Sequence, residues 1–221
     1  MLEELIQEYL HKPVENLFDM LEERKFSEKS ILPLLLLGRA YQLGVSGAPK
    51  DDLSAYFFFQ AASEWGCEEA DDLIDLTVFN GLHIETLFAR LEEEPHTFLK
   101  GCLLFEIGYM YQFTKLNERM TPKMDQEERN LIALKYYKQA AAYGNLDGMI
   151  QMNALLMMQE FQNQPDPSQR VSLSLMNLCN LCCRSHYPPV QMFLDELISK
   201  HVIIFDGVKE SQDLVNLLIG E

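Results

Sequence analysis

Apolar residues recur every three or four positions along most of the chain, which is the spacing of one buried face of an α-helix. No stretch alternates strictly between apolar and polar side chains, as a half-buried strand does. Glycine and proline residues interrupt the helical pattern, for example at Gly44, Gly144 and Pro167. The pattern therefore predicts an all-α protein.

Two types of helix alternate between these interruptions. Helices of the first type are expected near residues 31–43, 68–80, 97–113, 146–160 and 188–200. Helices of the second type are expected near residues 51–65, 83–93, 125–143 and 168–184. Asp51, Asp125 and Asp166 are predicted helix starts, because a carboxylate accepts hydrogen bonds from the first N–H groups of a helix. Capping helices are expected at both ends, over residues 2–24, with a break near Pro13, and over 209–219.

The first helix type follows a recurring pattern, which Leu37, Gly38, Tyr41 and Gly44 show most clearly. An apolar residue is followed by a small one, then by an aromatic residue one turn later and by a terminating glycine. Weaker copies, anchored at positions 74, 107, 152 and 193, follow about every 39 residues. A period of this length is typical of helical-repeat proteins.

The second helix type has paired aromatic residues between alanines and a closing glycine. Two copies match in spacing and residue type: Ala55, Phe58, Phe59, Ala62 and Gly66, and Ala133, Tyr136, Tyr137, Ala140 and Gly144. We expect the small residues to let the two helices of a pair approach closely. We expect the aromatic pair to fill the space between one helix pair and the next.

The segment LGRAYQLGVSGAPKDDLSAYFFFQAASEWGCEEA resembles a Sel1-like repeat, a relative of the tetratricopeptide repeat, and ALKYYKQAAAYGNLDG resembles the second helix of that repeat. The resemblance implies a right-handed α-α superhelix, a solenoid, with about four to five helix-pair repeats over residues 31–200. Capping helices would occupy 1–30 and 201–221, in one continuous domain. Asp75, where glycine is expected, and an enlarged turn over 113–128 depart from the family pattern.

Charge and composition narrow the classes of partner and compartment. The 34 acidic and 18 basic residues give a net charge of −16, which repels phosphate backbones, so we expect no nucleic-acid partner. The longest apolar run, 31–37, is too short to span a bilayer, so we expect no membrane insertion. Five cysteines and no visible secretory signal favour a cytoplasmic protein, with delivery to a host cytosol by a specialised secretion system as the alternative.

The residues Cys179, Cys182, Cys183 and His186 form the most suggestive cluster for chemistry, because their spacing places them along one helical face. Thiolate and imidazole are zinc ligands, so a metal-binding enzyme is one hypothesis. The competing interpretation is that these cysteines are small core residues, since adjacent thiols on one helix close a tetrahedral site poorly. We expect no catalytic residue, no metal and no cofactor.

The resemblance to Sel1-like proteins implies a non-enzymatic protein-protein interaction scaffold or adaptor that binds a protein partner on the concave surface formed by the first helices. The roles that the resemblance implies include that of a bacterial effector and that of a regulator of one. The candidate binding residues are those that the repeat pattern leaves free, together with bases of the enlarged turn: Arg39, Gln42, Tyr109, Gln112, Lys115 and Arg119. An alternative is a homo-oligomerising structural module, although a monomer is the expected state.

Overall fold

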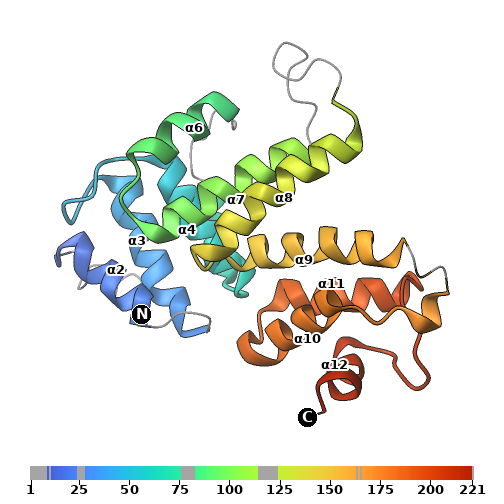
Figure 1. Ribbon diagram of the computed structural model, residues 1–221. Helices are drawn as coiled ribbons and strands as arrows, with labels where there is room; N and C mark the ends of the chain where they lie inside the picture. The colour runs from blue at the N-terminus through green and yellow to red at the C-terminus, as the bar shows by residue number, and fades with distance from the viewer. Residues whose placement is uncertain are drawn as a thin grey trace. The chain divides into compact units, whose positions relative to one another are not determined.

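The computed structural model describes residues 9, 11–23, 28–75, 83–113, 124–162, 164 and 166–220. Every regular element in these ranges is a helix and none is a strand, which confirms the predicted all-α class (Figure 1). The α-helices are α2 (Val14–Glu23), α3 (Ile31–Leu43), α4 (Asp52–Glu64), α5 (Glu68–Asp75), α6 (Ile84–Glu93), α7 (Thr97–Phe113), α8 (Gln126–Ala142), α9 (Leu146–Phe161), α10 (Leu173–Ser185), α11 (Pro188–Ser199) and α12 (Ser211–Ile219). Among them, no helix is both long and apolar enough to cross a membrane.

The chain divides into two compact units. The first comprises Met1–Gly81 with Ser185–Pro188, and the second comprises Leu82–Arg184 with Pro189–Glu221. Within the first unit, the Tyr187 hydroxyl donates a hydrogen bond to the Glu64 carboxylate at 2.7 Å, and its ring lies 5.0 Å from that of Trp65. Of the predicted second helix pair, α5 belongs to the first unit and α6 to the second.

Helix ends follow from side-chain capping, as the aspartates predict. The Asp51 side chain accepts from the Leu53 N–H at 3.2 Å, and the Asp125 side chain accepts from the Glu128 N–H at 2.9 Å. The helix predicted over 168–184 differs, because Asp166 caps only the short 3-10 helix η2 (Pro167–Gln169). The backbone leaves helical geometry at the next residue, at ψ 72°, so α10 begins only at Leu173.

In the first unit, α2, α3 and α4 pack around aromatic rings. A Cβ atom on Gly38 of α3 would lie 2.3 Å from the Phe59 ring of α4, so only glycine permits this approach of the two helices. The neighbouring Phe58 ring lies 5.6 Å from Tyr41 of α3 and 5.8 Å from Phe18 of α2.

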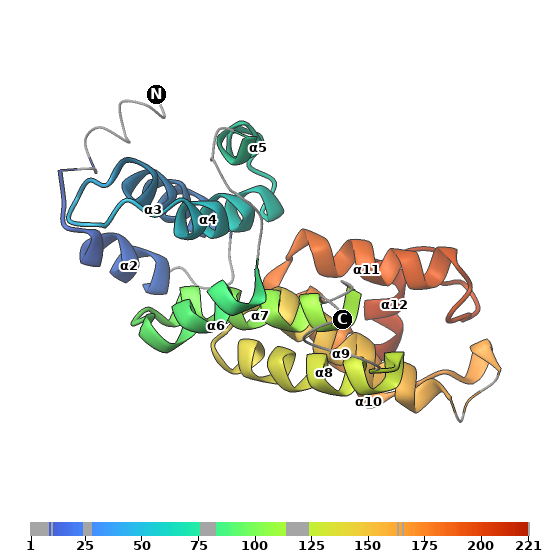
Figure 2. The same cartoon turned by 90° about the horizontal axis from the view of Figure 1, so that it is seen from above.

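In the second unit, α6, α7 and α8 make a corresponding set of contacts, and both cartoon views show α7 alongside α8 (Figure 2). A Cβ atom on Gly108 of α7 would lie 2.7 Å from the Tyr137 ring of α8. The Tyr136 ring lies 5.7 Å from Tyr111 of α7, stacked on it, and 6.0 Å from Phe88 of α6.

The two neighbouring aromatic residues in α4 and in α8 therefore have different roles. This refines the prediction that both residues lie between one helix pair and the next. Phe58 and Tyr136 reach back to the helix that precedes their own pair, as expected of residues between pairs. Phe59 and Tyr137 instead pack between the two helices of their own helix pair, each over a glycine of the facing helix. One packing arrangement thus occurs twice in the chain.

The last part of the second unit is held by polar contacts between helix ends and linkers. The Arg170 guanidinium donates to the Gln164 carbonyl at 2.9 Å and to the Val202 carbonyl at 2.6 Å. The Asp195 carboxylate of α11 accepts from the Ser211 N–H at the start of α12 at 2.5 Å. These contacts fix the linkers before α10 and α12.

Candidate functional site

Three aromatic side chains form a stripe along α7: Phe105, Tyr109 and Phe113. Their spacing of four residues places them on one face of the helix. The ring centroids lie 6.2 Å apart for the first two residues and 4.8 Å apart for the last two. We call this surface the α7 stripe.

The α7 stripe becomes more exposed toward the end of the helix. Phe105 is half-buried and packs against the core cluster that includes Tyr137 and Leu155. Tyr109 is 41% exposed and Phe113 54% exposed. Each ring contacts the previous one, so the exposed rings continue an aromatic contact that begins at the core.

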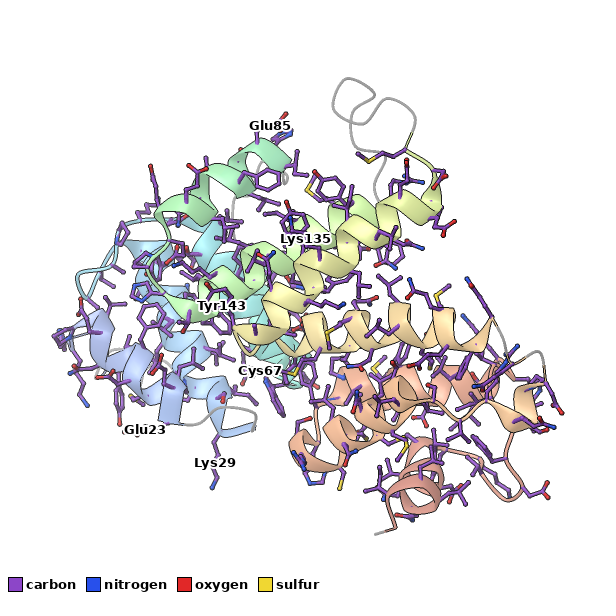
Figure 3. All side chains as sticks on the ribbon, in the orientation of Figure 1. Glu23, Lys29, Cys67, Glu85, Lys135 and Tyr143 are labelled. Atoms are coloured by element: carbon purple, nitrogen blue, oxygen red, sulfur yellow. The ribbon has the colours of Figure 1, made fainter. Side chains whose placement is uncertain are left out.

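Close packing on the α8 side of α7 accounts for this arrangement. Gly108 takes the Tyr137 ring directly against the helix backbone, and Ile107 beside it is fully buried. Eight of the seventeen residues of α7 are buried, and Tyr109 and Phe113 are its exposed large apolar residues. Exposed charged residues lie on helices that pack against it, including Glu85 on α6 and Lys135 on α8 (Figure 3).

Gln112 lies on the last turn of α7, and its amide oxygen accepts a hydrogen bond from a residue of α8. The hydroxyl of the fully buried Tyr137 donates to Gln112 Oε1 at 2.7 Å. Burial, followed by the charge of Glu106, raises the pKa of Tyr137 above its usual value, so this hydroxyl keeps its proton. The hydrogen bond fixes the orientation of the Gln112 amide.

The predicted binding residues fall into three groups. Tyr109 and Gln112 lie together on the last two turns of α7, in the second unit. Arg39 and Gln42 lie on α3 in the first unit, where Arg39 Nη1 donates to Gln42 Oε1 at 2.9 Å. The remaining two, Lys115 and Arg119, are outside the described residues.

Phe105 and Phe113 were not among the residues predicted for the site, although they complete the α7 stripe. Their spacing of four from Tyr109 is visible in the sequence and could have indicated a shared face. The exposure of Phe113 was not predictable in this way, because apolar residues at such spacing more often face a core.

Within the cysteine cluster, Cys179 and Cys182 are buried like core residues, whereas Cys183 is half-buried. Cys179 is fully buried, and burial raises the pKa of its thiol to about 12. The pKa of Cys182 is also raised by burial, which disfavours the thiolate form that binds metals. His186 is exposed and follows α10 with a φ of 52°. Across the described ranges, no three His, Cys, Asp or Glu side chains are grouped as a metal site.

Comparisons with known proteins add no identification. No protein-family model matches the chain. Searches of the curated proteins and of the solved structures find no match either. The function is therefore inferred from the residues and contacts of the chain alone.

Proposed function

We propose that this chain is a non-enzymatic protein-binding scaffold that takes up a segment of a protein partner on the α7 stripe. The observation that carries the proposal is the pair of exposed rings, Tyr109 and Phe113, whose centroids lie 4.8 Å apart on the last two turns of α7. Exposed aromatic groups of this kind are the side chains most often responsible for binding energy at protein interfaces.

The ring contacts favour binding because they reduce its entropic cost. Phe105 is anchored to the core, Tyr109 contacts Phe105, and Phe113 contacts Tyr109. Side chains that are already ordered lose less conformational entropy when a partner covers them. A long flexible side chain, such as lysine, would lose more.

We also propose that the helix pairs form a right-handed superhelix of the Sel1-like type, capped by α2 and α12. The repeated packing supports this architecture, since Gly38 with Phe59 and Gly108 with Tyr137 make the same contact in two helix pairs. In such an array the first helices of successive pairs line one surface. With this architecture, we propose that the protein acts as an adaptor, a class that includes bacterial effectors and their regulators.

A selection of peptides tests the binding proposal. A random peptide library displayed on phage is selected on the purified chain, and synthetic copies of the enriched peptides are titrated by fluorescence anisotropy. The double variant Tyr109→Ala/Phe113→Ala should lose about thirtyfold or more in affinity, the usual consequence of removing interface anchors.

Leu131→Ala is the matched control, since Leu131 on α8 is 54% exposed, as is Phe113, but is not part of the α7 stripe. It should change affinity by no more than about twofold, as residues outside an interface do. Failure to enrich any peptide, or equal affinity of the double variant and the wild type, refutes the proposed function. Self-association that the double variant abolishes would instead identify a second copy of the chain as the occupant.

A further inference from the structure

The turn between α10 and α11 is a short part of the carboxyl-terminal half of the chain that belongs to the first unit. α10 ends at Ser185 and α11 begins at Pro188, so the turn consists of His186 and Tyr187. Residues 185–188 belong to the first unit, whereas the rest of both helices belongs to the second. Because the turn is so short, any movement of Tyr187 acts directly on the adjoining ends of α10 and α11.

Tyr187 is buried against the end of α4. It is 2% exposed, and its hydroxyl donates to Glu64 Oε2 at 2.7 Å. Its ring centroid lies 5.0 Å from that of Trp65, at an interplanar angle of 53°. Glu64 is the last residue of α4, and Trp65 follows it as the C-cap. An aromatic contact and a hydrogen bond to a carboxylate, which is stronger than one between neutral groups, thus attach the turn to α4.

The Glu64 carboxylate is oriented by its own helix. Gln60, one turn earlier on α4, donates from Nε2 to Glu64 Oε1 at 3.0 Å. Each carboxylate oxygen therefore accepts from a different side chain, Oε1 from Gln60 and Oε2 from Tyr187. An acceptor that is already oriented loses less conformational entropy when the tyrosine hydroxyl binds it.

The backbone of the turn is strained at His186. Its φ is 52°, in the left-handed region, which costs energy for a residue with a side chain. The Tyr187 N–H donates to Ser185 Oγ at 3.2 Å, and Pro188 favours an extended backbone at the residue before it. Strain of this kind persists only where surrounding contacts compensate for it. The contacts of Tyr187 with α4 supply such compensation.

We propose that Tyr187 is a releasable anchor, through which the α10–α11 turn alternates between an attached and a released state. In the attached state, Tyr187 lies on Trp65 and bonds to Glu64. On release, both contacts are lost together, the strain at His186 is relieved, and the adjoining ends of α10 and α11 open with the turn. Local opening of this kind needs less free energy than unfolding of the whole chain. This inference does not depend on the proposed function.

Hydrogen exchange of the full chain, followed for each amide by nuclear magnetic resonance, measures the opening. Tyr187→Phe keeps the ring but removes the hydroxyl. The amides of Gly66, of residue 187 and of the last turn of α10 should then exchange about tenfold faster or more, the usual effect of losing a hydrogen bond to a charged group. The amides of α7 and α8 should keep their rates. Tyr143→Phe is the matched control, because Tyr143 is 43% exposed in the second unit, and it should leave the rates at Gly66 and Tyr187 unchanged.

His186→Gly should act in the opposite direction. Glycine adopts a φ of 52° without the steric cost, so this variant favours the attached state. Exchange at the same amides, relative to their intrinsic rates, should slow by about two- to fivefold.

A second measurement uses Trp65, the single tryptophan of the chain. Tyr187→Ala removes both contacts of the anchor, so the emission of Trp65 should shift to longer wavelength. Acrylamide should also quench this emission more strongly than in the wild type, while the circular dichroism spectrum remains helical.

Four results overturn the inference. The first is unchanged exchange in Tyr187→Phe at the end of α4 or at the end of α10, because the anchor would then not connect the two. The second is an equal increase at all amides, including those of α7 and α8, since this indicates unfolding of the whole chain. The third is faster exchange at these amides in His186→Gly. The fourth is Trp65 emission and quenching in Tyr187→Ala that equal those of the wild type.

Discussion

The substitution Gly108→Ala tests the packing that positions the α7 stripe. The new Cβ atom would lie 2.7 Å from the Tyr137 ring, well inside van der Waals contact. Tyr137 cannot move aside, because it is fully buried, contacts Phe105 and is bonded to Gln112. Forcing an added methyl group into such a core costs about 1–3 kcal/mol.

Gly101→Ala, in the same helix, separates this clash from the intrinsic effect of the substitution. Alanine gains about 1 kcal/mol over glycine in a helix interior, and both variants receive this gain. At Gly101, however, the nearest atom to the new Cβ is the Asn145 Cβ at 3.2 Å, where a shift of a few tenths of an ångström is sufficient. Gly108→Ala should therefore be less stable than Gly101→Ala by about 1–3 kcal/mol.

Urea unfolding followed by far-ultraviolet circular dichroism measures this difference from the transition midpoints of the two variants at equal slope. Gly108→Ala should also weaken peptide binding, because Tyr137 packs against Phe105, the residue that anchors the α7 stripe to the core. Equal stability of the two variants would show that α7 and α8 do not pack through Gly108 as described.

Three further predictions concern contacts away from the α7 stripe. Asn145→Ala should cost about 1 kcal/mol in urea unfolding, because it removes the side-chain oxygen that accepts from the Gly148 N–H at 2.7 Å and caps α9; an unchanged midpoint would contradict this. Arg170→Lys should cost about 1–2 kcal/mol by the same assay, since lysine cannot reproduce the forked contacts of the guanidinium, including the 2.6 Å bond to the Val202 carbonyl. The third prediction concerns pH. The pKa of Cys179 is raised from 9.0 to about 12, so its contribution to stability is complete below pH 9.0 and is lost as the pH rises toward 12. The loss of stability across this range should therefore be smaller in Cys179→Ala, and an identical pH profile would argue against the burial of this thiol.

Local sequence signals predicted most of the helices. α3 and α7 begin and end at the predicted residues. Both helices are apolar over most of their length, and a glycine in the left-handed conformation, Gly44, ends the first of them. The start of α10 was predicted too early. Asp166 and Pro167 form a helix-start signal, but the structure uses it for a single 3-10 turn. Capping residues alone do not distinguish the start of an α-helix from a single 3-10 turn.

The candidate site was predictable only in part. Tyr109 and Gln112 follow from positions that the repeat pattern leaves free. The hydrogen bond from Tyr137 to Gln112 joins residues on separate helices across the enlarged turn, so local periodicity does not reveal it. The same limit applies to Phe59 and Tyr137, which were expected between helix pairs. Their position over Gly38 and Gly108 depends on the distance between facing helices.

The most direct test of the central claim is a nuclear magnetic resonance titration of the full chain with an enriched peptide. Binding on the α7 stripe predicts that the largest shifts occur at the ring protons of Tyr109 and Phe113 and at the side-chain amide protons of Gln112. Shifts confined to other helices, with these three residues unchanged, would contradict the claim that α7 carries the binding site.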